Sequence, residues 1–383
     1  MILSAHRQLA RVCRYKQRQH WPCGLTRPMS AASSSEDERE NTAKQPTATT
    51  KMTTTTTQRQ MMKVWRDRFG KGIGQVIFLN SPTSGGVLLA SLAVGDPYLA
   101  VLAATGTVAS TATAYSVAGN RQQENALDAG LLAYNGCLIG CAAGGFLLPL
   151  HYGVFSTTLW TLILAPASTM VSLALPKVTG SVPQWTWAFN AVTLSQLLHI
   201  KPLSVTATAA AAAAEAATTE VAMASPSFGT LVASPLVGLS QIFVVNSAYT
   251  GLGITAAIAS YSPLLAVHAV VGSALGCLTG AALGAGGDTI AMGLWGYNAS
   301  LTSLAVGVFY QNTRAAWMLS AGGAIATAGI HGGLAALFGT FGCPCLTLPF
   351  CIAATGCHLL VDTMPGLKLS SSPHSPEQNT PDE

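Results

Sequence analysis

The sequence predicts an all-α polytopic membrane protein with about ten transmembrane helices plus re-entrant half-helices in two inverted repeats. Three observations support this fold class. Charged residues make up only 9% of the 383 residues, hydrophobic residues make up 50%, and several motifs recur in order in the second half of the chain. Because soluble proteins carry about 25% charged residues, the composition excludes a soluble enzyme, a nucleic-acid binder and a disulfide scaffold.

The charges concentrate at the N-terminus. Residues 1–71 hold 14 of the 19 Lys and Arg residues, and we expect this segment to be a disordered basic cytosolic tail. Residues 72–367 hold only four basic and seven acidic side chains. Residues 1–35 contain no acid, which would also fit a mitochondrial transit peptide. We favour the cytosolic tail over a transit peptide. The plasma membrane is accordingly the expected location, and the mitochondrial inner membrane is the alternative.

Apolar runs long enough to cross a bilayer core of roughly 30 Å fall into two groups of five. They define a first transmembrane repeat at 72–200, a Thr/Ala-rich inter-repeat loop at 201–235, a second repeat at 236–362 and a disordered C-terminal tail at 363–383. The expected spans lie near residues 73–94, 98–118, 126–150, 154–175 and 184–200, and then near 236–260, 264–285, 289–310, 315–337 and 344–362.

The two groups of spans are copies of one sequence. Three blocks recur in the same order, at offsets that shrink from 166 to 163 to 161 residues. An ordered set of this kind indicates an internal duplication over residues 74–362. The matched blocks are GQVIFLNSPTSG from Gly74 with SQIFVVNSAYTG from Ser240, LLAYNGCLIG from Leu131 with LWGYNASLTS from Leu294, and PQWTWAFN from Pro183 with PCLTLPFC from Pro344.

An odd number of spans per copy fixes how the copies are related. After five crossings the second copy enters the membrane from the opposite face, so the repeats are inverted. With the basic tail inside, the positive-inside rule can be checked on the five remaining cations. Four of them fall in inner loops, and only Lys201 falls outside. The four are Arg121, Lys177, Arg314 and Lys368.

The repeated polar residues are the first candidates for a functional site, because inverted repeats place substrate sites at their interface. Gln75 and Gln241 open the first block, and a Gln in a span must be paired or face a cavity. The alternative is hydrogen bonding between helices. Thr186 and Thr347 follow a Pro that suits the start of a half-helix. Their hydroxyls either meet a polar solute or bond back to their own helix.

Charge indicates the kind of solute. The expected spans hold no central Asp, Glu, Lys or Arg, whereas ion-coupled carriers bury ionisable groups. The nine Cys and eight His residues form no metal-ligand spacing, so we expect no metal and no cofactor. An intramembrane enzyme would need a nucleophile and base that converge, and no such set is evident. The sequence therefore predicts passage of a small, neutral, polar solute.

The motifs NSPTSG, LLAYNG with LWGYNASL, NSAYTG and LTLPF, in this order and duplicated, resemble the urea transporter family over about residues 72–362. The resemblance implies a passive, channel-like conductor of urea in a lipid bilayer, not an enzyme. It also implies a homotrimer with one pore per protomer and no nucleic-acid partner. The alternatives are a channel for another small neutral solute such as short amides, ammonia or water, an ion-coupled secondary transporter, or an intramembrane enzyme.

The resemblance also implies roles for particular residues. Gln75 and Gln241 would face urea, and the hydroxyls of Thr186 and Thr347 would lie at the pore centre. Two flat apolar slots would flank them. In this sequence the slot positions fall on Phe78 with Leu131 and on Ile242 with Leu294. Only Phe78 among them is aromatic, and Ala188 stands where the family motif has Pro, so the chain departs mildly from the family pattern.

Overall fold

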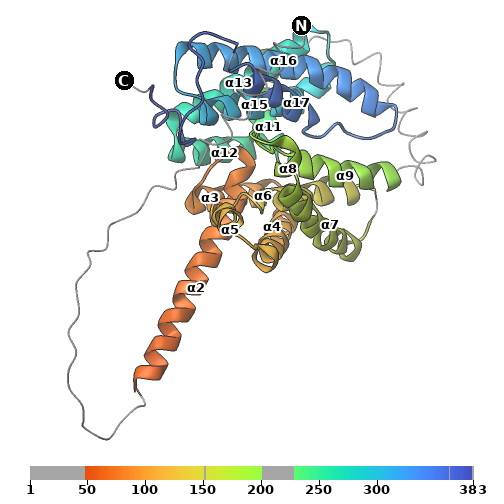
Figure 1. Cartoon of the computed structure of the whole chain (residues 1–383). Coiled ribbons are helices and arrows are strands. Elements are labelled where there is room, and N and C mark those ends of the chain that lie inside the picture. Colours follow the sequence, from red (N-terminus) through yellow and green to blue (C-terminus); the bar gives the residue numbers. More distant parts are fainter. Residues whose placement is uncertain (1–47, 151, 201–227, 362, 382–383) are drawn as a thin grey trace, which may run out of the picture. The chain divides into compact units, whose positions relative to one another are not determined.

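The computed structural model describes residues 48–150, 152–200, 228–361 and 363–381 (Figure 1). The chain divides into residues 1–57 and residues 58–383. Of the first part only the helical residues 48–57 are described, and the account below concerns the second part. Among the described residues of this part the regular elements are helices, together with one isolated antiparallel bridge between Tyr310 and Leu369. The prediction of an all-α fold is confirmed.

The helices follow the order of the two sequence copies. The first copy contains α2 (Ala48–Gly74), a 3₁₀ turn (Gln75–Ile77), α3 (Pro82–Gly95), α4 (Pro97–Val117), α5 (Arg121–Asp128), α6 (Tyr134–Ala142) with a π-helical end (Ala143–Leu147), α7 (Val154–Ala174), α8 (Pro176–Thr179) and α9 (Trp187–Ile200). The second contains α11 (Phe228–Gln241), α12 (Ala248–Tyr261), α13 (Pro263–Ala282), α14 (Gly287–Ala291), α15 (Tyr297–Phe309), α16 (Arg314–Gly339) and α17 (Leu348–Leu359).

The packing repeats as the sequence does. In the first copy α4 packs against α6 and α7, and in the second α13 packs against α15 and α16. These two groups are visible in Figure 1, the first in orange to olive green and the second in teal to blue. The copies meet where α3 packs against α12 and where α9 packs against α17. The largest buried apolar cluster draws residues from both copies, among them Phe189 and Phe350. The duplicated halves therefore share one core.

Two of the predicted spans contain a break. Within 73–94 the chain leaves the helix at Phe78, whose φ is +65°, and within 236–260 it does so at Val244, whose φ is +61°. Each following helix starts at a capped serine: the Ser81 side chain accepts from the Ser84 amide, and the Ser247 side chain accepts from the Thr250 amide. Each break joins two apolar residues to an Asn-Ser pair, and Pro82 follows the first pair. The mean hydropathy of the run stays high, so the signal for the break is the Asn-Ser pair and not hydropathy.

Three helices in the described part are long and apolar enough to cross a membrane. They cover Val154–Thr179, Pro263–Ala282 and Arg314–Gly339. A fourth candidate is the pair of helices Gln58–Ile77 and Pro82–Gly95. The chain bends by 71° at the short break between them. Most of the remaining apolar helices are shorter, because breaks divide the segments that the sequence presents as single runs.

The expected N-terminal tail and inter-repeat loop differ from the structure near their C-terminal ends. Residues 58–71, placed in a disordered tail by composition, belong to α2, and the Arg68 guanidinium forms a 2.8 Å ion pair with Asp128. Residues 228–235, placed in a loop, begin α11. The rest of both segments, 1–47 and 201–227, lies outside the described residues. Both helices therefore begin earlier in the chain than the sequence boundaries indicated.

The C-terminal segment is not a disordered tail up to residue 381, because it is hydrogen-bonded to the second repeat. The Gln311 amide donates to the Lys368 carbonyl at 2.9 Å, and the Asn379 side chain donates to the Val308 carbonyl at 2.7 Å. The Glu377 carboxylate accepts from the Ser262 hydroxyl at 2.5 Å and from the Leu264 amide at 2.8 Å. An acidic group stabilises a helix N-terminus through its unpaired N–H groups, and Glu377 does this for α13.

This contact should depend on pH. Partial burial raises the pKa of Glu377, but hydrogen bonds from Ser262 and Leu264 outweigh that effect, so the pKa lies below its usual value. A lowered pKa in the folded state means that the ionised carboxylate stabilises docking. The stabilisation is complete above the usual Glu pKa of about 4.3 and is lost as the pH falls through the lower folded value.

Replacing Glu377 by Gln is therefore expected to loosen the C-terminal segment at neutral pH. Amide hydrogen exchange at Gln311 and Asn312 reports this, because both amides donate to the segment. Exchange at pH 7 should be faster in Glu377→Gln than in the unaltered protein, and the two should converge as the pH falls through the lowered pKa of Glu377, where the carboxylate becomes protonated. Glu124→Gln, on the exposed helix α5, is the control. A difference that does not shrink at all as the pH is lowered until the carboxylate is protonated would contradict the proposed role of the charge.

Candidate functional site

Four non-glycine residues with positive φ mark the ends of the half-helices, and they occur as repeat pairs. Phe78 and Val244 are separated by 166 residues, and Trp185 (φ +44°) and Leu346 (φ +49°) by 161. A bulky residue adopts this conformation only where its surroundings enforce it. The structure thus brings four strained backbone positions to the break points of the two copies.

The recurring Tyr-Asn pair holds the second of these breaks in each copy. The Tyr134 hydroxyl donates to the Trp185 carbonyl, and the Tyr297 hydroxyl donates to the Leu346 carbonyl at 2.6 Å. The neighbouring asparagines accept from the first turn of the half-helices: Phe189 N donates to Asn135 Oδ1 at 3.3 Å, and Phe350 N donates to Asn298 Oδ1 at 3.4 Å. These bonds satisfy helix-end groups that would otherwise be buried without partners.

The two half-helices α9 and α17 bring the predicted central threonines into contact. Thr186 Oγ1 and Thr347 Oγ1 are 2.7 Å apart, and each residue is only 3% exposed. Asn190 from the first turn of α9 bridges the copies, since its side-chain nitrogen donates to Thr347 Oγ1 at 2.9 Å and to the Thr186 carbonyl at 2.9 Å. Two uncharged hydroxyls thus meet where the copies join.

Phe78 lies in an aromatic cluster that sequence reasoning missed. Its ring centroid is 6.3 Å from that of Trp185, 6.0 Å from Phe309 and 6.2 Å from Phe350, all in edge-to-face geometry. Such arrangements are favoured by the ring quadrupole. The repeated blocks contain both Trp185 and Phe350. Trp185 directly precedes Thr186 in the sequence, and Phe350 lies three residues after Thr347. This closeness in sequence was a signal for the aromatic cluster.

The other predicted slot residues occupy different environments. Leu131 follows α5 in a turn and is 39% exposed, and Leu294 occupies the corresponding turn after α14 and is half-buried. Ile242 is 2% exposed and belongs to the main apolar cluster. The residue that shares the backbone conformation of Phe78 at the 166-residue offset is Val244, not Ile242.

The two repeated glutamines differ in their contacts. Gln75 is buried, and its side-chain nitrogen donates to the Ala129 carbonyl at 2.8 Å. This bond joins the turn after α2 to the turn after α5. It agrees with the alternative in which Gln75 forms a hydrogen bond between helices. Gln241 is half-buried, and its amide makes no hydrogen bond to another described residue. The carboxamide of Gln241 is therefore the freer of the two to meet a solute.

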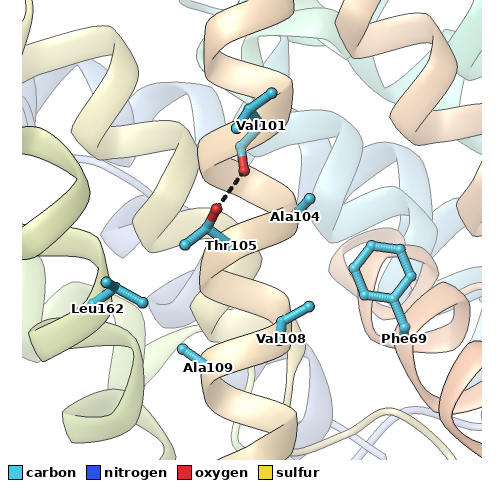
Figure 2. A pocket seen from close by; sticks show the side chains of 7 residues that line it. All are labelled: Phe69, Val101, Ala104, Thr105, Val108, Ala109 and Leu162. Carbon is cyan, nitrogen blue, oxygen red and sulfur yellow. Dashed lines mark hydrogen bonds between the residues drawn. The ribbon is translucent and has the colours of Figure 1, made fainter. Parts of the chain in front are cut away.

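A groove on the outer face of the first copy is separate from these residues. It has a volume of about 400 Å³, and its lining is almost wholly apolar (Figure 2). The one hydroxyl in it, from Thr105, donates to the Val101 carbonyl of its own helix at 2.8 Å. Val101 and Leu162 are exposed, as side chains facing lipid would be. The lining residues are Phe69, Val101, Ala104, Thr105, Val108, Ala109 and Leu162.

Metal binding finds no support in the described part of the chain, where no group of three or more His, Cys, Asp or Glu side chains could hold an ion. Fold and site together define a helical membrane protein built from two copies of one unit. The copies meet at uncharged half-helix ends that carry a pair of hydroxyls and a cluster of aromatic rings.

Comparison with known proteins identifies the family. A family model described as urea transporter matches residues 67–362. The chain is 30% identical over 307 residues to urea transporter 1 of Ovis aries. This match covers 78% of this chain and 77% of that protein. It is also 30% identical over 301 residues to urea transporter 1 of Mus musculus, with the same coverage. The chain belongs to the urea transporter family, and the predicted polytopic membrane class is confirmed.

Proposed function

We propose that the protein conducts urea passively, down its gradient, along a path between the two repeats. The observation that carries this proposal is the contact between Thr186 and Thr347, which offers uncharged hydroxyl groups at the junction of the copies. Urea is planar and neutral, with N–H edges that need acceptors once its water is removed, at several kcal/mol for each unpaired polar group. Aromatic and aliphatic side chains near the junction suit its flat faces. Family membership supports the same solute.

The topology and assembly belong to this proposal as well. Five crossings per copy would make the repeats inverted, with one path per protomer in a homotrimer, and the plasma membrane is the proposed location. The protein would then be a transporter and not an enzyme. The half-helix breaks at repeat-paired positions support the inverted arrangement, because such breaks are typical of transporters built in this way.

Uptake of labelled urea into liposomes that contain the purified protein tests the function. We expect uptake well above that of protein-free liposomes, and unaffected by a proton or sodium gradient. Acetamide as competitor separates urea from the alternative of a channel for short amides. Uptake equal to the protein-free level, with folded protein confirmed in the liposomes, would refute the proposal, and gradient-driven uptake would support coupled transport instead.

Replacing each repeated glutamine by Leu should separate the two positions. Gln241→Leu is expected to lower urea uptake several-fold with little change in thermal stability, because its amide makes no hydrogen bond within the described residues. Gln75→Leu should lower uptake and also stability, by about 1 kcal/mol, because it removes the bond to Ala129. Melting in detergent and liposome uptake measure the two effects. Unchanged uptake in Gln241→Leu would assign that side chain to packing alone.

A further inference from the structure

The C-terminal segment satisfies the last backbone carbonyls of helix α15. A helix leaves its final carbonyl groups without partners inside the helix, and α15 ends at Phe309. The Asn379 side-chain nitrogen donates to the carbonyls of Gly307 at 3.2 Å and Val308 at 2.7 Å. The Ser370 amide donates to the carbonyl of Phe309 at 2.9 Å. Three successive carbonyls at this helix end therefore accept from the C-terminal segment.

The side chain of Asn379 uses all of its hydrogen-bonding capacity in this contact. It is 1% exposed, and its oxygen accepts from the Ser370 hydroxyl at 2.9 Å and from the His374 amide at 3.2 Å. An Asn side chain has two N–H donors and an oxygen with two lone pairs. Backbone amides only donate and carbonyls only accept, so these neighbours fix which way the Asn379 amide points. An Asp at this position would lose both donors to α15.

Phe309 connects this helix end to the aromatic cluster. Its ring centroid is 5.3 Å from that of Trp185 and 6.0 Å from that of Phe78. Trp185 directly precedes Thr186, one of the two threonines at the junction of the copies. The backbone of Phe309 is thus bonded to the C-terminal segment, while its ring packs against residues beside the junction.

We propose that Asn379 is a positioning residue for conduction: it fixes the end of α15, holds the Phe309 ring in the aromatic cluster and thereby sets the width of the path there. This rests on the proposed urea conduction and deepens it by naming what determines the size of solute that passes. Phe309 lies in the last turn of α15, and helix ends are where helices fray. A released ring leaves more space at the cluster, so a solute broader than urea gains more than urea does.

Asn379→Asp tests this, because it keeps the size and the acceptors of the side chain and removes both donors to α15. We measure uptake of urea and of N-methylurea, which is planar and neutral but broader, into liposomes under identical conditions. The methylurea-to-urea ratio should rise about threefold or more, as expected for the loss of one or two hydrogen bonds. Gln378→Glu makes the same amide-to-carboxylate change on the neighbouring, exposed side chain, and its ratio should equal the unaltered one.

A second measurement separates positioning from a general loss of stability. Phe309→Leu removes the ring, so adding Asn379→Asp to it should change the ratio by less than about 1.5-fold, because the two residues act through one contact. A general loss of stability would change the ratio equally in both backgrounds. Ser370→Ala is a milder variant that removes one bond to the Asn379 oxygen, and it should raise the ratio about twofold.

The outcomes distinguish this inference from the proposed function. If the unaltered protein conducts urea and folded Asn379→Asp keeps or lowers the ratio, the inference is overturned while the proposed function stands. An equal change in the Phe309→Leu background overturns it as well. If Asn379→Asp yields too little folded protein, Ser370→Ala decides in the same way. If the unaltered protein shows no urea uptake above protein-free liposomes, the proposed function itself fails.

Discussion

Urea uptake should fall about 10- to 100-fold when Thr186 and Thr347 are both replaced by Val. Val has nearly the shape of Thr but cannot accept a hydrogen bond, so N–H groups that pass the junction would lose two partners. An unsatisfied buried polar group is unfavourable by about 1–3 kcal/mol, and part of that loss can be offset by neighbouring carbonyls. Initial rates of labelled urea uptake into liposomes measure the change.

The control for this double replacement is Thr193→Val on the same helix α9. Thr193 is fully buried, and its hydroxyl has no hydrogen-bond partner among the described residues, so uptake should stay near the unaltered level. Thr186→Ser and Thr347→Ser keep a hydroxyl and should retain most of the uptake. Full uptake in the double Val variant, with folded protein present, would show that these hydroxyls do not contact the solute.

Replacing Gly85 by Ala should sharply lower the amount of folded protein. A Cβ at Gly85 would lie 1.8 Å from the Gly70 carbonyl oxygen, and one at its repeat counterpart Gly251 would lie 1.9 Å from the Leu236 carbonyl oxygen. Backbone atoms cannot move aside cheaply, and overpacking is unfavourable by about 1–3 kcal/mol or more. Gel filtration and melting temperature in detergent measure the loss of stability.

The neighbouring residue provides an internal comparison. A Cβ at Gly86 would meet nothing within 4 Å, so Gly86→Ala should fold normally in the same helix α3. Gly251→Ala in α12 should behave like Gly85→Ala. Equal stability of the Gly85 and Gly86 variants would mean that α2 and α3 can separate without penalty, and the close approach would then have no structural importance.

The duplication was the most informative feature of the sequence, because matched blocks name matched positions. It led from Thr186 to Thr347, and the structure brings the two together. The breaks at Phe78 and Val244 were not predictable from hydropathy, since a left-handed residue within an apolar run does not change that measure. The local signal is the Asn-Ser pair after each break, because Ser81 and Ser247 cap the helices that follow.

The sequence also did not predict two sets of hydrogen bonds, because each joins residues that are far apart in the chain. The bond from Asn190 to Thr347 joins residues 157 positions apart, and nothing near Asn190 in the sequence signals it. The C-terminal segment is polar and reads as disordered, but Glu377 and Asn379 find partners on α13 and α15. The fold class and the correspondence of Thr186 with Thr347 could thus be read from the sequence, whereas the partners that orient these residues could not.

The first shortening of the second copy, by three residues, falls at a single helix. Helix α5 has eight residues and its counterpart α14 has five, a difference that equals the fall in offset from 166 to 163. The turns that follow keep the same left-handed glycine, at Gly130 and Gly293. The three-residue length change therefore lies before this repeated turn, and the two copies match at a constant offset from the turn through the block that follows it. This makes α5 and α14 the natural sites for inserting a reporter or an epitope into the protein.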